Sequence, residues 1–340
     1  MKDYYFIGID VSKKDLDCCL LYNGIVVKHE TISNHQKSIE SYLYTLCSDQ
    51  NVDIEQLILC AEYTGLYIYP LITVCQSFGY KLWMEDPTQI KYSSGLQRGK
   101  NDAVDAKRIA LYAFRYADRM KLYHRSSASI ESLKLLSSEL NMLCIDKAKY
   151  KGQLSDQKEY MPNNIYKLKS KRLILLIKEL DKAINSIEAD IENIIMENDQ
   201  LSHQMKLLLT VEGIGKKTAL KVILETQAFT KFTDSRKFCC HAGVAPFSYV
   251  SGSSQHSRNR VSQRANKSIK TLLHLGALSA LQRKDSELRI YYDRKIAEGK
   301  NKMSVLNAIR AKLISRMFAV IKNGSCYSFS YVNQHSNPQM

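Results

Sequence analysis

Residues 5–11 read Tyr-Phe-Ile-Gly-Ile-Asp-Val, a short apolar run rich in β-branched and aromatic residues. Such a run predicts a buried β-strand. The apolar stretches 17–22 and 25–31 flank Asn23-Gly24, which supplies the positive φ values of a two-residue hairpin turn. Strand and helix patterns then alternate, with helices expected near 36–47, 67–78 and 103–116 and strands at 57–61 and 81–84. We therefore expect residues 1–125 to form an α/β domain with a mixed sheet.

Residues 126–205 lack strand patterns and predict a helical connector. Its apolar residues repeat at alternating steps of four and three: Leu173, Ile177, Leu180, Ile184, Ile187, Ile191 and Ile194. This spacing predicts a coiled coil. A similar run at 130–143 lies upstream, and the Pro-Asn segment at 161–164 separates the two. The pattern fits an antiparallel hairpin and equally a dimerisation arm.

Residues 206–325 predict a basic, mainly α-helical domain, followed by a tail at 326–340. Helices are expected at 218–227, 265–282, 285–298 and 301–321, with an irregular segment near 246–260. Residues 201–320 hold 22 basic and 7 acidic residues, a net charge of +15, whereas residues 1–100 carry −3. This imbalance predicts a polyanionic partner for the C-terminal domain, although a basic surface can also serve solubility alone.

The composition of the 340 residues is that of a globular protein, with 45% hydrophobic and 24% charged residues. No apolar run approaches the roughly 18 residues of a membrane span, and the first residues resemble neither a signal nor a transit peptide. We therefore expect no membrane partner and a cytoplasmic location.

Four acidic residues of the first domain lie at the ends of predicted strands or at the start of a predicted helix. Asp10 and Glu62 each end a predicted buried strand, where loss of hydration is costly unless a cation lies nearby. Asp102 and Asp105 begin a predicted helix, and their three-residue spacing places them on one face. Each aspartate could instead simply favour the helix start. Together the four predict a site for Mg²⁺ or Mn²⁺, which prefer oxygen ligands and can align a phosphate.

Two further segments lie in the basic domain. Residues 208–219 contain Gly213 and Gly215 in a Gly-Ile-Gly turn, followed by Lys216 and Lys217, and predict a helix-hairpin-helix that binds phosphate through backbone amides. Ser251 precedes a glycine in the serine-rich segment 245–254, so it could be a nucleophile toward phosphate or only a turn residue. Cations that could contact nucleic acid follow it: Arg258, Arg260, Arg264 and Lys267.

Five motifs stand in order along the chain: GIDVS at 8–12, AEYTG at 61–65, KNDAVDAKRIA at 100–110, VEGIG at 211–215 and HAGVAPFSYVSG at 241–252. In this order they resemble the DEDD-type insertion-sequence transposases related to the Piv and MooV DNA invertases, over nearly the whole chain. The resemblance implies a RuvC-like, ribonuclease H-type domain, a coiled-coil connector and a C-terminal transposase domain. One departure is Ala265, where the family commonly has glycine.

The resemblance also implies a mechanism. It makes Asp10, Glu62, Asp102 and Asp105 the metal-binding tetrad and Ser251 the nucleophile, with Ser248, Ser253 and Ser254 as competitors in the same loop. It implies a transposase or recombinase that cuts and rejoins DNA through a covalent phosphoserine. The implied partners are double-stranded donor and target DNA, a structured guide RNA called a bridge RNA, and further copies of the chain in a homodimer or homotetramer joined by the coiled coil.

Two other functions remain open from the residues alone. A hydrolytic RuvC-like nuclease would use the same carboxylates to activate water and would leave no protein–DNA adduct. A non-catalytic nucleic-acid-binding protein would show no dependence on divalent metal.

Overall fold

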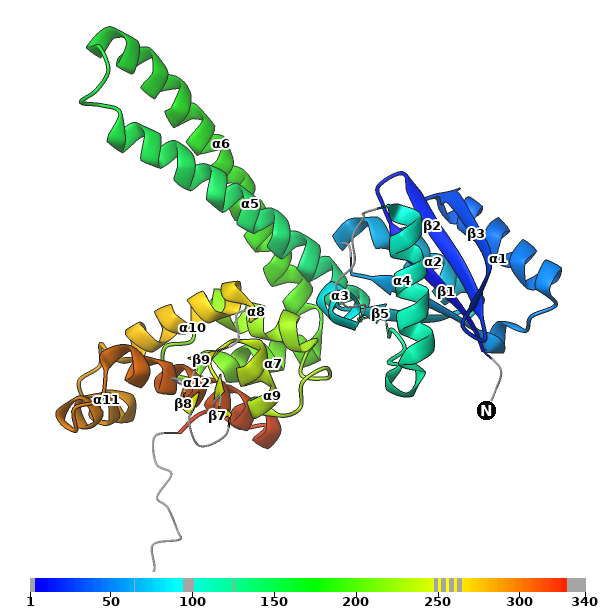
Figure 1. Cartoon of the computed structure of the whole chain (residues 1–340). Helices are drawn as coiled ribbons and strands as arrows, with labels where there is room; N and C mark the ends of the chain where they lie inside the picture. Colours follow the sequence, from blue (N-terminus) through cyan, green and yellow to red (C-terminus); the bar gives the residue numbers. More distant parts are fainter. Residues whose placement is uncertain are drawn as a thin grey trace, which may run out of the picture. The chain divides into compact units, whose positions relative to one another are not determined.

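The computed structural model describes residues 4–63, 65–93, 101–124, 126–247, 250–251, 255–256, 260–261 and 265–328. The chain divides into two compact units, Met1–Arg125 and Ser126–Met340 (Figure 1). The further boundaries expected at 205 and 325 stay predictions.

The first unit contains a five-stranded mixed sheet in the order β3-β2-β1-β4-β5. Strands β1, β2 and β3 pair antiparallel, and β1, β4 and β5 pair parallel. The turn between β2 and β3 has φ values of 50° at Asn23 and 80° at Gly24, as the hairpin prediction requires. The expected mixed-sheet α/β domain is confirmed. The strands are β1 (Tyr5–Val11), β2 (Asp15–Tyr22), β3 (Ile25–Ser33), β4 (Leu57–Glu62) and β5 (Lys81–Glu85).

Helices cover both faces of this sheet. One face packs against α1 (Gln36–Gln50) and α2 (Tyr69–Phe78) through a core that includes Ile7 and Ile9. The other face packs against α4 (Asp102–Arg115) through a core that includes Phe6 and Trp83. The two cores alternate along β1 because successive side chains of a strand point to opposite faces. A short helix that the sequence pattern did not predict, α3 (Pro87–Ser93), precedes α4, and one-turn 3-10 helices lie at Ile54–Gln56, Gly65–Ile68 and Ala117–Arg119.

Gly8 in the middle of β1 allows α4 to approach the sheet closely. A Cβ atom at Gly8 would lie 2.2 Å from both the Ala106 carbonyl oxygen and the Ala110 backbone nitrogen. Ala106 and Ala110 are themselves fully buried small residues of α4. The helix therefore rests backbone to backbone on the strand, and any side chain at residue 8 would separate them.

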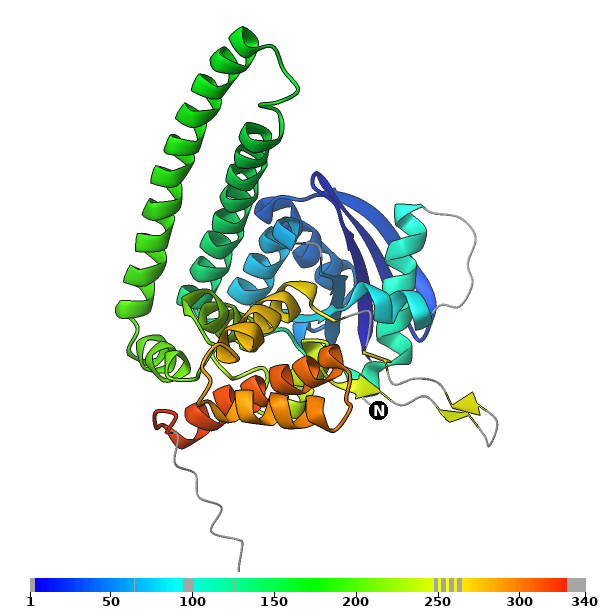
Figure 2. The ribbon, with the colours of Figure 1, turned by 90° about the vertical axis from the view of Figure 1, so that its left-hand side faces the viewer.

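The second unit begins with a long helical hairpin of α5 (Ala128–Asp156) and α6 (Asn163–Met196). The two green helices lie side by side in Figures 1 and 2, and the short connection between them makes them antiparallel. At its base, Ile130 and Leu133 of α5 and Ile187, Ile191 and Ile195 of α6 belong to the core of the helical domain. A hairpin within one chain is thus present; its coiled-coil character and a role in dimerisation stay predictions.

The rest of the second unit is mainly helical, as expected. Its core centres on α12, whose Ile309, Leu313, Ile314 and Met317 are fully buried. The helices are α7 (Asp199–Leu209), α8 (Lys216–Thr226), α9 (Ser235–His241), α10 (Lys267–Ala280), α11 (Glu287–Ala297) and α12 (Lys302–Asn323). Helix α9 was not predicted. No helix within the described parts of the chain has the length and apolarity needed to cross a bilayer.

The segment expected to be irregular between α9 and α10 contains paired strands. Strand β6 (Pro246–Phe247) pairs antiparallel with β9 (Arg260–Val261), and β7 (Val250–Ser251) pairs antiparallel with β8 (Gln255–His256). We call residues 242–265 the serine ribbon. Its nested pairings bring residues from both ends of the segment together, so the ribbon leaves and re-enters the helical domain at one place.

We predict that Gly8→Ala destabilises the first unit by about 1–3 kcal/mol, because overpacking forces β1 and α4 apart. Trp83 is the single tryptophan and is buried under α4, so its fluorescence during urea unfolding reports on this unit. Gly152→Ala is the control, because the Cβ atom at this position in α5 meets no atom closer than 4.0 Å. An unchanged Trp83 transition in Gly8→Ala would contradict the close packing.

Candidate active site

Asp10 and Glu62 lie next to each other at the carboxyl edge of the sheet. Strands β1 and β4 run parallel, and Ile9 lies opposite Ala61. The next residue of each strand, Asp10 in β1 and Glu62 in β4, is therefore a neighbour of the other. Both side chains are half-buried. Asp10 lies two residues after Gly8, and Glu62 lies two residues after Cys60. Residues two positions apart in a strand point to the same face, and Gly8 and Cys60 face α4, so both carboxylates point to the α4 side of the sheet.

Asp102 and Asp105 lie in the first turn of α4. The helix cap itself is Asn101, whose side-chain oxygen accepts a hydrogen bond from the Ala103 backbone N–H at 3.3 Å. The two aspartates are thus not needed as caps, although the positive end of the helix dipole favours them. Arg108, one turn later, forms an ion pair with Asp105 at 2.5 Å.

The four carboxylates interact electrostatically. Burial raises the pKa of Asp10, and the negative charges of Asp105 and Asp102 raise it further. Burial also raises the pKa of Glu62, and the next largest contributions come from Asp10 and Asp105. The fold therefore brings together the carboxylates that the sequence singled out, from two strands and one helix, at the cost of mutual repulsion.

Other acidic residues that sequence analysis did not select surround this group. Asp17 pairs with Asp10 across β1 and β2, raises the pKa of Asp10, and accepts a hydrogen bond from Thr31 Oγ1 at 2.6 Å. Asp86, just beyond β5, raises the pKa of Glu62. Glu85 has a structural role, since it accepts hydrogen bonds from Trp83 Nε1 and Tyr112 Oη. Asp86 could not be selected from the sequence alone, because only the order of the strands shows that the end of β5 lies beside the end of β4.

The chemistry of these side chains suits a hard divalent cation. Carboxylate oxygens are the ligands that Mg²⁺ and Mn²⁺ prefer. Burial and mutual repulsion both raise the pKa values of Asp10 and Glu62, and a bound cation would relieve the repulsion. Within the described residues, however, no three His, Cys, Asp or Glu side chains converge closely enough to hold a metal ion. The donor set fits the ion, while a formed coordination shell is not part of this structure.

Ser251 is the last residue of β7, and its backbone pairs with Gln255 of β8. Residues 252–254, which follow it, lie outside the described residues. The competing serines at 248, 253 and 254 lie outside the described residues, as do Arg258 and Arg264; for Arg260 only the strand position in β9 is described. Lys267 is exposed at the start of α10.

The Gly-Ile-Gly turn between α7 and α8 has two different glycines. Gly213 has a φ of +80°, and a Cβ atom there would lie 2.3 Å from the Gly276 carbonyl oxygen, so it allows the turn to pack on α10. Gly215 precedes α8 with open space around it. Lys216 forms an ion pair with Glu192 of α6 at 2.5 Å, whereas Lys217 is exposed. Phosphate binding at this turn stays a prediction, and Lys216 would have to leave Glu192 to take part in it.

Two family models match the chain. A DEDD-type IS110 transposase model matches residues 7–158, and a model described as the transposase IS116/IS110/IS902 family matches residues 205–293. The first range contains all four carboxylates, and the second contains Ser251 and the Gly-Ile-Gly turn.

The chain is also similar to several known proteins. It is 24% identical over 323 residues to the pilin gene-inverting proteins of Moraxella bovis and Moraxella lacunata, an alignment that covers 93% of this chain and 95% of each relative. It is 30% identical over 142 residues to an uncharacterised 43.6 kDa protein of insertion element IS110 from Streptomyces coelicolor, covering 42% of this chain and 34% of that protein. Among solved structures, Thermus thermophilus RuvC in complex with a Holliday junction aligns with 35% of this chain at 11% identity and a TM-score of 0.29.

We predict that Asp10→Asn stabilises the metal-free first unit at neutral pH. Burial and neighbouring carboxylates raise the pKa of Asp10 in the folded state, so its ionised form opposes folding at any pH above that raised value. This penalty disappears as the pH falls below the unfolded pKa of about 4. Thermal melts with a chelator, followed by Trp83 fluorescence, measure this effect. The melting temperature of the variant should exceed that of the wild type at pH 7 and equal it at pH 3.5.

The exposed Asp49 of α1 supplies the control variant, Asp49→Asn, which makes the same substitution in the same unit outside the acidic group. If Asp10→Asn had a lower melting temperature than the wild type at pH 7 in chelator, the ionised Asp10 would not destabilise the fold, and the prediction would be wrong.

Proposed function

Because this chain belongs to the IS110 family of DEDD-type transposases, we propose that it cuts and rejoins DNA strands through a covalent phosphoserine on Ser251, assisted by its four carboxylates. The observation that carries the proposal is the grouping of Asp10, Glu62, Asp102 and Asp105 from three separate elements around one edge of the sheet. A half-buried acidic group of this kind is unfavourable for stability alone, and perturbed pKa values cluster at functional sites.

The carboxylates would hold Mg²⁺ or Mn²⁺, and the bound ion would polarise the scissile phosphate and stabilise the leaving oxygen. Asp10 and Glu62 are fixed by the register of β1 and β4, whereas Asp102 and Asp105 depend on the position of α4. Arg108 can keep the charge of Asp105 partly balanced when no cation is bound.

Ser251 would attack the phosphorus of a DNA strand with its hydroxyl oxygen. A Ser251–phosphate ester forms as one DNA P–O bond breaks, and the released DNA oxygen leaves as a hydroxyl after taking up a proton. Attack by a hydroxyl of another strand reverses these steps and frees the serine, so no ATP is needed. The position of Ser251 at the end of β7, in a pair of short antiparallel strands, supports its presentation to a substrate.

The basic second unit would bind the nucleic acids. Residues 201–320 carry a net charge of +15, which favours double-stranded donor and target DNA. A bridge RNA as guide follows from the family resemblance alone. The relatives named as pilin gene-inverting proteins, with 93% of this chain aligned, support recombination over simple hydrolysis.

Assembly into a homodimer or homotetramer is a further part of the proposal. The α5–α6 hairpin keeps apolar residues exposed, among them Ile165, Leu168 and Leu175 of α6. These residues lie three and seven positions apart, which places them along one stripe of the helix. A second copy of the hairpin could cover that stripe. We also expect the protein to act in the cytoplasm.

A hydrolytic nuclease is the second candidate, because the same carboxylates could activate water instead. That enzyme would cut DNA without forming an adduct and without rejoining strands. The trapping experiment below separates the two.

We predict that wild-type protein incubated with a suicide DNA substrate, guide RNA and Mg²⁺ forms a denaturant-resistant protein–DNA adduct, which peptide mapping places on the segment containing Ser251. Ser251→Ala should lose the adduct while the protein stays folded, because the substitution removes only the hydroxyl that would attack phosphorus. Adducts that persist in Ser251→Ala and vanish in Ser253→Ala or Ser254→Ala would move the nucleophile. Efficient cleavage without any adduct would favour the nuclease.

We predict that Asp105→Asn lowers the cleavage rate by at least about 100-fold while DNA affinity stays unchanged, because a lost metal ligand affects the chemical step and not the basic surface. Cleavage assays in Mg²⁺, in Mn²⁺ and in chelator, together with binding titrations, measure both quantities. Asp118→Asn is a suitable control, since that aspartate is largely exposed after α4. Wild-type cleavage rates that are equal in chelator and in Mg²⁺ would contradict the metal site.

A further inference from the structure

The two ends of the serine ribbon meet where it leaves the helical domain. His241, at the end of α9, accepts a hydrogen bond through its backbone carbonyl from the Asn266 backbone N–H at 2.9 Å. One residue further in, Gly243 faces Ala265, whose Cβ atom would lie 2.3 Å from a Cβ atom on the glycine. The ribbon thus has a narrow base formed by residues 241–243 on one side and 265–266 on the other.

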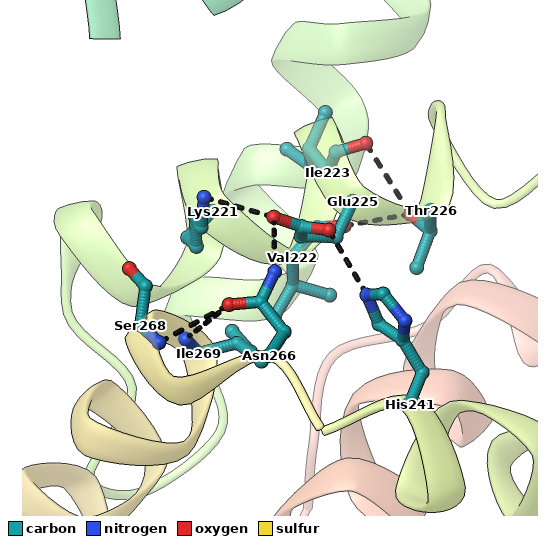
Figure 3. Close-up of polar contacts among 9 residues, drawn as sticks. All are labelled: Lys221, Val222, Ile223, Glu225, Thr226, His241, Asn266, Ser268 and Ile269. Carbon is teal, nitrogen blue, oxygen red and sulfur yellow. Dashed lines mark hydrogen bonds and ion pairs between the residues drawn. The ribbon is translucent and has the colours of Figure 1, made fainter. Parts of the chain in front are cut away.

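A single carboxylate binds both sides of this base. Glu225, in the last turn of α8, accepts a hydrogen bond at Oε1 from Asn266 Nδ2 at 2.8 Å, and its Oε2 lies 3.0 Å from His241 Nε2 (Figure 3). Lys221, one turn earlier, forms an ion pair with Glu225 at 2.8 Å. Glu225 is 16 residues from His241 and 41 from Asn266, so this contact joins three separate parts of the chain.

The carboxylate is held in its charged form. Burial alone would raise the pKa of Glu225, but hydrogen bonds from His241 and Lys221 outweigh burial and lower the pKa to about 2. At neutral pH Glu225 therefore accepts and His241 Nε2 donates. Charge-assisted hydrogen bonds of this kind are about twice as strong as neutral ones.

Both residues bound by Glu225 are themselves fixed. Asn266 caps α10, since its Oδ1 accepts hydrogen bonds from the backbone N–H groups of Ser268 and Ile269 at 3.1 and 3.3 Å. The His241 ring lies 5.1 Å from the Phe232 ring and 5.8 Å from the Phe238 ring. Neither side chain can turn away without losing other contacts.

The backbone that follows Glu225 is strained. Gln227, Ala228 and Phe229 have consecutive φ values of 50°, 54° and 64°, a left-handed conformation that residues with a Cβ atom adopt at a cost. The fully buried Thr226 supports this turn, because its Oγ1 accepts a hydrogen bond from the Phe229 backbone N–H at 3.1 Å. Such strain persists where surrounding structure requires it, and it is common next to functional sites.

We propose that Glu225 is a positioning residue that clamps the two ends of the serine ribbon and so fixes how Ser251 is presented to DNA. The inference rests on the proposed role of Ser251, but the clamp itself can be tested without it. Glu225 does not touch the reacting atoms; it acts through His241 and Asn266. Without the carboxylate, the ribbon base opens more often while the helical core stays folded.

The test compares three full-length variants with the wild type. Glu225→Ala removes every contact of the clamp, and Glu225→Gln keeps an oxygen that can accept from Asn266 but removes the charge. Glu192→Ala is the matched control, because it also removes a glutamate–lysine ion pair, between Glu192 and Lys216, at a largely exposed site away from the ribbon.

The first measurement is hydrogen–deuterium exchange without DNA, followed at the Asn266 backbone N–H that donates to the His241 carbonyl oxygen. Exchange of a hydrogen-bonded amide reports how often its surroundings open, and loss of a hydrogen bond to a charged group corresponds to roughly a tenfold change in the open population. We expect about tenfold faster exchange of this amide in Glu225→Ala, a smaller increase in Glu225→Gln and none in Glu192→Ala. Unchanged exchange in Glu225→Ala, or faster exchange spread evenly over the whole helical domain, would overturn the clamp.

The second measurement is the rate of adduct formation on the suicide DNA substrate at saturating DNA. We expect Glu225→Ala to slow this rate by roughly the same tenfold factor with an unchanged DNA dissociation constant, because the base of the ribbon and not the basic surface is altered. An unchanged rate would overturn the positioning role. If the wild-type protein forms no adduct, the proposed function of Ser251 fails, and hydrogen exchange at Asn266 still decides whether Glu225 clamps the ribbon.

Discussion

The contact between β1 and α4 at Gly8 is the constraint on which the candidate active site depends. The strand fixes Asp10, and the helix brings Asp102 and Asp105, so their separation is set by how closely the two backbones approach. Only a residue without a Cβ atom permits that approach. The buried Ala106 and Ala110 serve the same purpose from the helix side, since larger side chains there would lift α4 from the sheet.

The same packing concentrates negative charge. Asp10, Glu62 and the two aspartates of α4 repel one another, and Arg108 forms an ion pair with Asp105. A half-buried carboxylate of the second unit shows the opposite: Glu225 has three partners, which lower its pKa to about 2. The four carboxylates of the first unit repel one another and are suited to bind a cation. Glu225 has its charge neutralised by partners of its own chain and is suited to a structural role.

Local patterns predicted the elements of the fold well because they record local physics. The apolar run of β1, the Asn23-Gly24 turn and the helical periodicity of α12 each reflect burial or backbone preference within a few residues. The strand pairs of the serine ribbon were not predicted, since a serine-rich segment carries no apolar alternation. The four carboxylates could be selected because strand ends and helix starts are local features. Glu225 could not, because its partners lie 16 and 41 residues away, and the pairing of Lys216 with Glu192 was hidden for the same reason.

The α5–α6 hairpin returns to the core from which it leaves, because Ile130 and Leu133 share that core with Ile187, Ile191 and Ile195. Its far end can therefore change length without disturbing its base. Adding one heptad to each helix would move the tip outward by about 10 Å, since an α-helix rises 1.5 Å per residue, and would keep the same faces in contact. Matched insertions in α5 and α6 can therefore change the distance that the hairpin spans while the helical domain stays intact.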